Sequence, residues 1–210
     1  MNTAAQFIQL ALKKQVLKFG EFTLKSGRIS PYFFNAGLFD DGESLTLLGE
    51  YYAASLHDSG IEFDMLYGPA YKGIPIATAV SVAFYKLYAR NIPVAFNRKE
   101  AKDHGEGGVL IGAPLAAKVL IIDDVVSAGT SVRESIAVIE NNGAQVAGIS
   151  VALDRQEKGS GELSAIEELK KQYGLTTVAI AGLDDLISYL ADDKEKLTLV
   201  QNYKKSYGSH

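Results

Sequence analysis

Short apolar segments of strand length alternate with helical patterns along most of this chain, and this alternation restricts the fold more than any other feature. Strands are predicted at 63–67, 93–96, 118–122, 146–153 and 176–181, and helices at 44–57, 74–88, 131–141, 163–173 and 183–190. Several of the strands are apolar throughout, which is typical of a parallel sheet covered by helices on both faces. The predicted fold class is therefore α/β, with an open, mostly parallel sheet.

The N-terminal part follows a different pattern and predicts a small subdomain ahead of the sheet. Thr3 and Gln6 have the spacing of a capping box, and the apolar residues after them predict a helix over 3–18. Gly20 is expected to end that helix, and β-rich pieces at 22–24 and 32–34 flank a turn at 25–28. We predict a single domain over 1–210, with a hood formed largely by residues 1–40.

Composition excludes several classes of protein. Lys and Arg together number 21 and Asp and Glu 25, which gives a net charge of −4 and argues against a nucleic-acid coat or a polybasic membrane binder. Cysteine is absent, so disulfides, thiolate metal sites and cysteine catalysis are excluded. No apolar run reaches the length of a membrane span, and the N-terminus lacks the pattern of a secretion signal. We expect a cytoplasmic protein with neither nucleic acid nor membrane as partner.

The segment 119–131, VLIIDDVVSAGTS, carries the densest chemical information. Asp123 and Asp124 follow an apolar strand, and the carboxyl ends of such strands are where open parallel sheets bind ligands. Glycine and hydroxyl residues over 127–131 lead into a helix, where free N–H groups favour a phosphate. Acids so close to an anion site would repel a ligand that is phosphate throughout. The two acids therefore predict a sugar phosphate whose ring becomes cationic. The structural alternative is that Asp123 caps the strand and Asp124 is solvated.

Two further segments predict anion contacts. The loop 68–75, GPAYKGIP, offers free amides and Lys72 at the same edge of the sheet, although a plain turn with an exposed lysine is the alternative. The segment 98–108, RKEAKDHGEGG, combines basic side chains with glycines that permit a mobile flap. Its alternative is a solvated hairpin. A closing flap would bring Lys102 and His104 onto a leaving group and exclude water.

The segment 119–131 resembles the phosphoribosyl diphosphate (PRPP) signature of the type I phosphoribosyltransferase family. The resemblance implies that this loop holds the 5-phosphate and that the two acids lie against the ribose hydroxyls. The loop 68–75 resembles the family's pyrophosphate loop, which implies a non-proline cis peptide at Ala70–Tyr71. Ser127 stands where the family usually has Thr, and Ser131 where a small apolar residue is common.

Three other segments resemble the members of the family that use orotate. The segment 98–108 is similar to their catalytic loop, 23–35 to their hood, and 152–155 to the strand end that supplies an arginine to the base. The resemblance implies transfer of ribose 5-phosphate from PRPP to N1 of orotate, giving orotidine 5′-monophosphate and pyrophosphate in pyrimidine synthesis. A purine-type phosphoribosyltransferase and a PRPP-sensing regulatory protein of the same fold are the alternatives.

The resemblance also implies roles for individual residues. Catalysis is assigned to Arg98, Lys99, Lys102, His104, Asp123 and Asp124. PRPP binding is assigned to Lys25, Tyr71, Lys72, Arg98, Lys99, Lys102, His104, Asp123, Asp124, Val125, Val126, Ser127, Ala128, Gly129, Thr130 and Ser131. Orotate binding is assigned to Phe33, Phe34, Ser127 and Arg155, with one phenylalanine expected in the core because strand side chains alternate.

Cofactor and partners follow from the same resemblance. It implies Mg²⁺ held by PRPP near Asp123 and Asp124, with no direct protein ligand assigned. It also implies a homodimer in which Lys25 and Lys99 reach the neighbouring subunit's site. Without the resemblance, we would expect Lys25 to be solvated and Arg155 to form a surface ion pair with Asp154 or Glu157. His57 and His210 are expected to be solvated.

Overall fold

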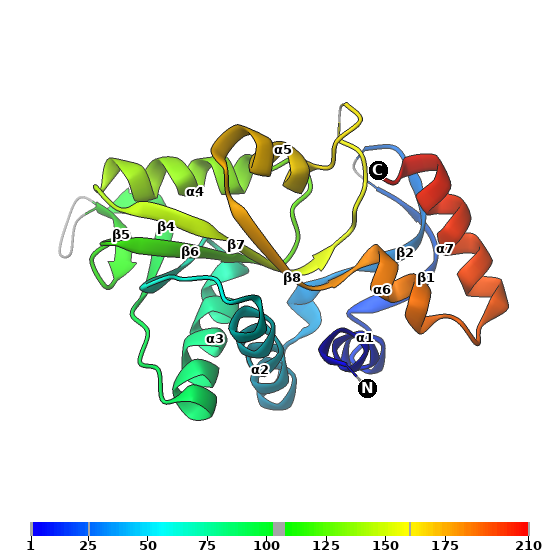
Figure 1. The fold of residues 1–210 in the computed structure, drawn as a ribbon, viewed down its shortest axis with the longest axis horizontal. Helices are drawn as coiled ribbons and strands as arrows, with labels where there is room; N and C mark the ends of the chain where they lie inside the picture. Colours follow the sequence, from blue (N-terminus) through cyan, green and yellow to red (C-terminus); the bar gives the residue numbers. More distant parts are fainter. Residues whose placement is uncertain (1, 25, 103–107, 160, 210) are drawn as a thin grey trace.

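The computed structural model describes residues 2–24, 26–102, 108–159 and 161–209, and for 99–102 and 108 it describes the backbone. Its main sheet has six strands in the order β5-β4-β3-β6-β7-β8 (Figure 1). The bounds are β3 (Met65–Gly68), β4 (Val94–Lys102), β5 (Gly108–Gly112), β6 (Lys118–Asp123), β7 (Gln145–Asp154) and β8 (Thr176–Gly182). Neighbours are parallel except β4 and β5, which are antiparallel. The predicted α/β class with a mostly parallel sheet is confirmed.

Helices cover both faces of this sheet (Figure 1). On one face lie α2 (Gly42–Ser59) and α3 (Gly73–Tyr88), and on the other α4 (Thr130–Asn141) and α5 (Ala165–Tyr173). On β6, Leu120 and Ile122 join the core of the first face, whereas Ile121 joins the core of the second. Successive strand side chains point to opposite faces, so a strand buried on both sides has to be apolar throughout.

The N-terminal subdomain differs from the expectation. It contains α1 (Thr3–Lys13), the antiparallel pair β1 (Leu17–Thr23) and β2 (Ile29–Phe34), and a short 3-10 helix, η1 (Ala36–Leu38). The prediction of a helix to residue 18 was wrong, because Gln15 adopts a left-handed φ of 59° and the chain turns into β1. The capping residue is Asn2, whose Oδ1 accepts from the Ala5 N–H at 2.9 Å. Gly20 lies inside β1, where the register with β2 shifts.

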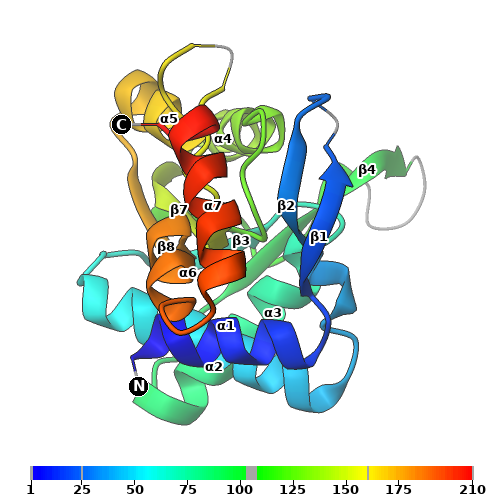
Figure 2. The ribbon, with the colours of Figure 1, turned by 90° about the vertical axis from the view of Figure 1, so that its right-hand side faces the viewer.

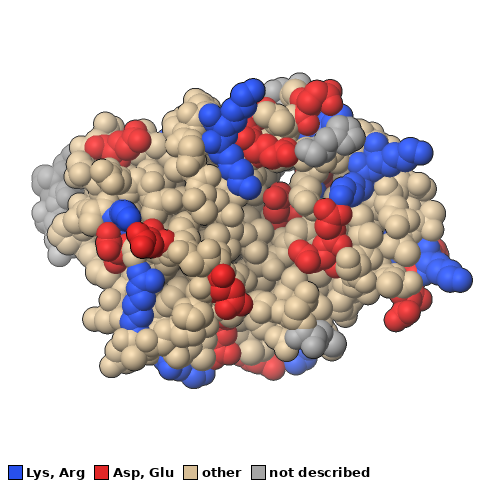
Figure 3. Space-filling model, in the orientation of Figure 1, with Lys and Arg blue, Asp and Glu red and all other residues tan. Residues whose placement is uncertain are grey.

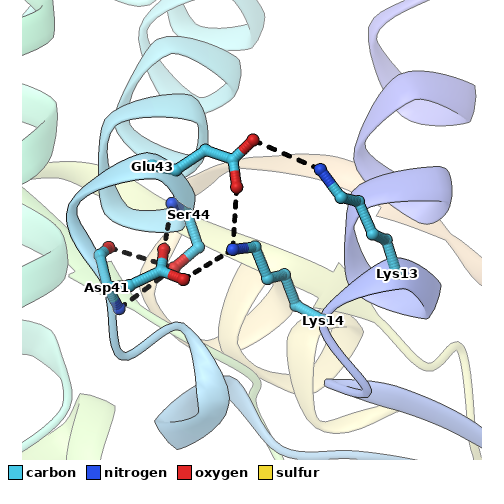
Figure 4. A network of polar contacts seen from close by, with 5 residues as sticks. All are labelled: Lys13, Lys14, Asp41, Glu43 and Ser44. Carbon is cyan, nitrogen blue, oxygen red and sulfur yellow. Dashed lines mark hydrogen bonds and ion pairs between the residues drawn. The ribbon is translucent and has the colours of Figure 1, made fainter.

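Charged side chains tie the end of α1 to the start of α2 (Figure 4). Lys14 Nζ lies 2.5 Å from Asp41 Oδ2 and 2.8 Å from Glu43 Oε2, and Lys13 also pairs with Glu43 at 3.2 Å. Asp41 is the N-cap of α2 and accepts from the Ser44 N–H at 2.7 Å. The hydrogen bond from Lys14 lowers the pKa of Asp41. Helix α1 is thereby joined to α2, one of the helices that cover the sheet.

The chain ends in two helices, α6 (Leu183–Tyr189) and α7 (Lys194–Tyr207), of which α7 was not predicted. Figure 2 shows α7 running beside the β1–β2 hairpin, and its buried residues Val200 and Tyr203 are the reason it packs there. The Tyr203 ring meets the Tyr32 ring of β2 edge-on, with centroids 6.0 Å apart. Among the helices of the described part of the chain, none combines the length and apolarity needed to span a bilayer.

Candidate functional site

Two neighbouring carboxylates lie at the carboxyl end of β6. Asp123 and Asp124 are 9% and 6% exposed. Burial, together with the charge of Asp124, raises the pKa of Asp123 to about 7. One oxygen of Asp123 accepts from the Asp124 N–H at 2.9 Å, and the other accepts from the Ser131 hydroxyl at 3.3 Å. The pair is therefore a concentrated negative site at the sheet edge predicted for ligand binding.

Hydrogen bonds from distant parts of the chain hold the backbone of this pair. The hydroxyl of Tyr52, on α2, donates to the Asp123 carbonyl at 2.6 Å, and the Ala152 N–H donates to the Asp124 carbonyl at 2.9 Å. Tyr52 is fully buried. Sequence reasoning missed Tyr52, because a tyrosine in a helical pattern gives no sign of which carbonyl its hydroxyl will reach.

The loop after β3 packs closely against the end of β6. Its Ala70–Tyr71 peptide is cis, as predicted, and the Ala70 N–H donates to Asn97 Oδ1 at 2.7 Å. A Cβ atom on Gly73 would lie 2.5 Å from Pro69 Cδ and 2.8 Å from the Ile122 carbonyl oxygen, so only glycine fits here. This close approach sets the position of Lys72.

Lys72 joins this loop to the acidic pair. Its Nζ lies 2.7 Å from Asp124 Oδ2, so two segments predicted independently meet at one place. Tyr71 beside it is 68% exposed. An ammonium, a carboxyl pair and a set of loop amides thus share the same edge of the sheet.

The loop after β6 leads into α4 with its polar groups facing outward. Gly129 has a left-handed φ of 73°, and the Ala128 carbonyl accepts from Arg133 Nη1 at 2.7 Å. Ser127, Thr130 and Ser131 are exposed, while Val125 and Val126 are half-buried. Exposed hydroxyls at the N-terminus of a twelve-residue helix suit an anionic group.

A hollow of about 350 Å³ lies between the loop after β3 and helix α4, and Arg98 is part of its lining. Its lining comes from β3, β4, the 68–73 loop and α4, and consists of Tyr67, Pro69, Ala70, Asn97, Arg98, Ser131, Glu134, Ser135 and Val138. Arg98 is half-buried. Of the predicted flap, this arginine is the basic side chain that the structure describes.

The other predicted flap residues are described in part or not at all. Lys99 and Lys102 lie on β4, but their side chains are outside the described part, as are Lys25 and His104. The ends of the flap form the antiparallel pair of β4 with β5, in which Lys102 is opposite Gly108. Strand β5 was not predicted.

Phe33 and Phe34 point to opposite sides of β2. Phe34 is 8% exposed and belongs to the core, whereas Phe33 is 41% exposed and stacks on Phe22 with centroids 5.5 Å apart. The expectation that one of the two is a core residue is confirmed. Phe33 is the ring left accessible to a ligand.

Arg155 follows β7 and pairs with Glu157, its Nη2 lying 2.6 Å from Glu157 Oε1. The pair is largely buried, with side chains 14% and 13% exposed. The alternative of a surface ion pair therefore named the right partner, but the pair does not lie at the surface. The guanidinium carbon lies 4.2 Å from the centre of the Tyr32 ring.

Acidic and basic side chains intermingle on the face shown in Figure 3. His57 is exposed, as expected, and its ring stacks on Tyr88 with centroids 4.2 Å apart. His210 lies outside the described residues.

Comparisons with known proteins bear on the whole chain. Residues 39–182 match the family model of the phosphoribosyl transferase domain. The chain is 59% identical to the orotate phosphoribosyltransferase of Cronobacter sakazakii and 57% identical to that of Yersinia enterocolitica, in each case over 97% of both chains. It is also similar to a crystal structure of the orotate phosphoribosyltransferase of Francisella tularensis. That match has a TM-score of 0.89 and 43% identity and covers 97% of this chain and 100% of the other.

Proposed function

This chain belongs to the orotate phosphoribosyltransferases of the phosphoribosyltransferase family, and from that premise we propose how its residues carry out the reaction. The reaction moves ribose 5-phosphate from PRPP to N1 of orotate, yielding orotidine 5′-monophosphate and pyrophosphate for pyrimidine synthesis. The observation that carries the residue roles is the contact of Lys72 with Asp124, which joins the acidic pair to the loop after β3 beside the hydroxyl-lined start of α4.

We assign the ribose 5-phosphate to the β6–α4 segment. The amides and hydroxyls of 125–131 would hold the 5-phosphate at the N-terminus of α4. Asp123 and Asp124 would face the ribose and stabilise the positive charge that develops on its ring as the anomeric C–O bond breaks. Asp123 has to be ionised for this role, and its raised pKa makes ionisation sensitive to pH near neutrality.

We assign the leaving pyrophosphate to Tyr71 and to the basic side chains at the same edge. Tyr71 and Lys72 lie in the loop after β3, and Arg98 lines the hollow beside it. Lys25, Lys99, Lys102 and His104 are assigned here from the family resemblance. Opposite charges are thus stabilised at the two ends of one breaking bond, which is electrostatic catalysis.

Orotate is a planar anion, and two described side chains suit it. Phe33 offers an accessible aromatic face, and Arg155 a guanidinium for a carboxylate or ring carbonyl. Ser127, exposed in the loop after β6, would donate to another edge of the base. Phe34 lies in the core on the opposite side of β2, so Phe33 is the ring of this pair that we assign to the base.

Mg²⁺ fits the donor set at this site. Within the described residues no group of three or more His, Asp or Glu side chains gathers around one point, and the site itself offers two carboxylates. Magnesium is commonly bound by one or two carboxylates together with substrate phosphates. PRPP would hold the ion near Asp123 and Asp124, with no direct protein ligand assigned. The chemistry that the ion supplies when bound is partial neutralisation of the diphosphate charge.

We also propose a homodimer with shared active sites. Exposed apolar pairs on two elements support an interface: Val82 and Tyr85, one turn apart on α3, and Val109 and Ile111 on the same face of β5. In that dimer Lys25 and Lys99 would act in the neighbouring site. The single domain over 1–210 and the cytoplasmic compartment stay predictions.

The reaction is tested by following the ultraviolet absorbance of orotate in the presence of purified protein, PRPP and Mg²⁺. We expect orotate to be consumed only when PRPP is present, with orotidine 5′-monophosphate and pyrophosphate formed in equal amounts. Consumption of a purine base in place of orotate, or PRPP binding without any turnover, would contradict the assignment.

A further inference from the structure

Several hydrogen bonds within the protein fix the side chain of Arg155. A mobile arginine that supplied only its charge to a ligand would not need them. Its Nε donates to Glu157 Oε1 at 2.8 Å, and its Nη2 lies 2.6 Å from the same oxygen. Nη2 also donates to the Ser30 hydroxyl at 3.1 Å. One edge of the guanidinium is thereby fixed by a carboxylate from its own loop and a hydroxyl from β2.

Tyr32 fixes the same pair from a second direction. Its ring lies under the Arg155 guanidinium, and its hydroxyl donates to Glu157 Oε1 at 3.3 Å. Tyr32 is fully buried, and Tyr203 of α7 packs edge-on against its ring. Glu157 Oε1 is therefore the atom on which three donors converge, from β2 and from Arg155 itself.

The loop that carries Glu157 is itself fastened at both sides. The Lys158 N–H donates to the Tyr207 carbonyl at 2.8 Å, and the Ser209 N–H to the Gln156 carbonyl at 2.8 Å. From β1–β2, Arg28 Nη1 donates to the Lys158 carbonyl at 2.8 Å. The backbone beneath Glu157 is thus fixed by both the hood and the C-terminal helix.

We propose that Glu157 is a positioning residue for orotate binding, which orients the Arg155 guanidinium toward the base through its Oε1 atom. The proposal rests on the orotate contact proposed above for Arg155. A buried ion pair contributes little net stability, because desolvation offsets most of its Coulomb energy. The reason to keep one beside a substrate site is geometry, because the carboxylate holds the Arg155 guanidinium in one orientation. A planar base with ring carbonyls is then recognised by direction as well as by charge.

Two conservative substitutions separate geometry from charge. Glu157→Asp keeps the charge but withdraws the carboxylate from Arg155, whereas Glu157→Gln loses the charge but keeps an oxygen at the same reach. We expect Glu157→Asp to raise the KM for orotate about tenfold, the loss of about 1.4 kcal/mol of binding free energy, and Glu157→Gln to raise it less than about threefold. The KM for PRPP and kcat should stay within about twofold of wild type in both.

The matched control is Glu162→Asp. Glu162 lies in the same loop and pairs with Lys158, so the same truncation there should leave the KM for orotate unchanged. An unchanged KM in Glu157→Asp, an equal rise in the KM for PRPP, or a larger effect of Glu157→Gln than of Glu157→Asp would overturn the positioning role alone. A wild-type protein that does not use orotate would instead overturn the proposed function, and the inference with it.

Discussion

Asp123 illustrates how a single side chain can be arranged for chemistry at the expense of stability. Its pKa is raised to about 7 from an ordinary value of 3.8, so the folded protein holds its proton where the unfolded chain has released it. The stabilisation this gives is complete below pH 3.8 and is lost as the pH rises to about 7. Above neutrality the ionised carboxylate therefore destabilises the ligand-free fold.

Replacing Asp123 by Asn should separate these two effects. We expect turnover to be lost, while the free energy of unfolding at pH 8 rises by about 1–3 kcal/mol because no charge is buried. The gain should shrink toward pH 5, where wild-type Asp123 is itself protonated. Thermal unfolding at the two pH values measures this gain in stability, with a substitution at an exposed position, Asp192→Asn, as the control. An Asp123→Asn variant less stable than wild type at pH 8 would show that the carboxylate has a structural role.

The site residues that could be predicted are those that are close to one another in the sequence. The run 119–131 places two acids and three hydroxyls on one strand, its following loop and the first turn of α4, so its chemistry is local. Tyr52, Asn97 and Glu157 act through contacts whose direction depends on packing between distant segments. No spacing pattern carries that information: Tyr52 and Asn97 were not predicted, and Glu157 was predicted only as an alternative surface partner of Arg155.

At the level of elements, the contact between α2 and α3 depends on the absence of one side chain. A Cβ atom on Gly49 would lie 2.5 Å from the Ala79 carbonyl oxygen, closer than real contacts allow. The two helices would have to separate to admit a methyl group. Because Tyr52 is also on α2, that separation would be transmitted to the Asp123 carbonyl.

Gly49→Ala should therefore destabilise the protein even though alanine is the better helix former. We expect the free energy of unfolding to fall by about 1–3 kcal/mol, the usual cost of overpacking. Gly42→Ala is the control, since nothing lies within 4 Å of a Cβ atom at that position of the same helix. Denaturant unfolding of both variants checks the prediction; equal stabilities would show that the helices separate without cost.

The elements that were predicted well are those whose burial is periodic. Strands β3, β6, β7 and β8 were predicted to within two residues at each end, whereas β4 continues to Lys102, six residues beyond its predicted end. Helix α7 buries only Val200 and Tyr203, so its sequence lacks a clear apolar stripe. Helix α1 was extended too far because Val16 and Leu17 continue an apolar spacing that the backbone leaves at Gln15. Strand β5 is short and follows a glycine-rich segment that suggests a loop.

At the scale of the molecule, the hood and the sheet share one hydrophobic core. Phe7 of α1, Tyr32 of β2, Leu48 of α2 and Leu120 of β6 belong to the same buried cluster, together with Tyr203 of α7. This continuity supports the proposal of one domain over 1–210. It also means that the sides of the site proposed to bind the base and the sugar are held by the same packing.

The proposal of a homodimer with shared active sites gives a prediction about assembly. Lys102→Ala and Asp123→Asn should each reduce kcat by about 10²-fold or more, as loss of an electrostatic contact to the transition state does. If the flap of one subunit serves its neighbour, mixing and re-equilibrating the two variants creates hybrid dimers with one intact site, and about a quarter of wild-type activity should return. Activity is measured after mixing in equal amounts. Sites completed within one subunit would leave the mixture as inactive as its components.

The path of the last residues has a practical consequence for producing the protein. Because the Ser209 N–H is hydrogen-bonded to Gln156, an affinity tag joined at this end would be anchored next to the loop of Arg155 and Glu157. With Arg155 in its proposed role, we expect such a fusion to change the KM for orotate in the assays that measure it. A cleavable tag ahead of Asn2, at the far end of α1, leaves that loop as it is.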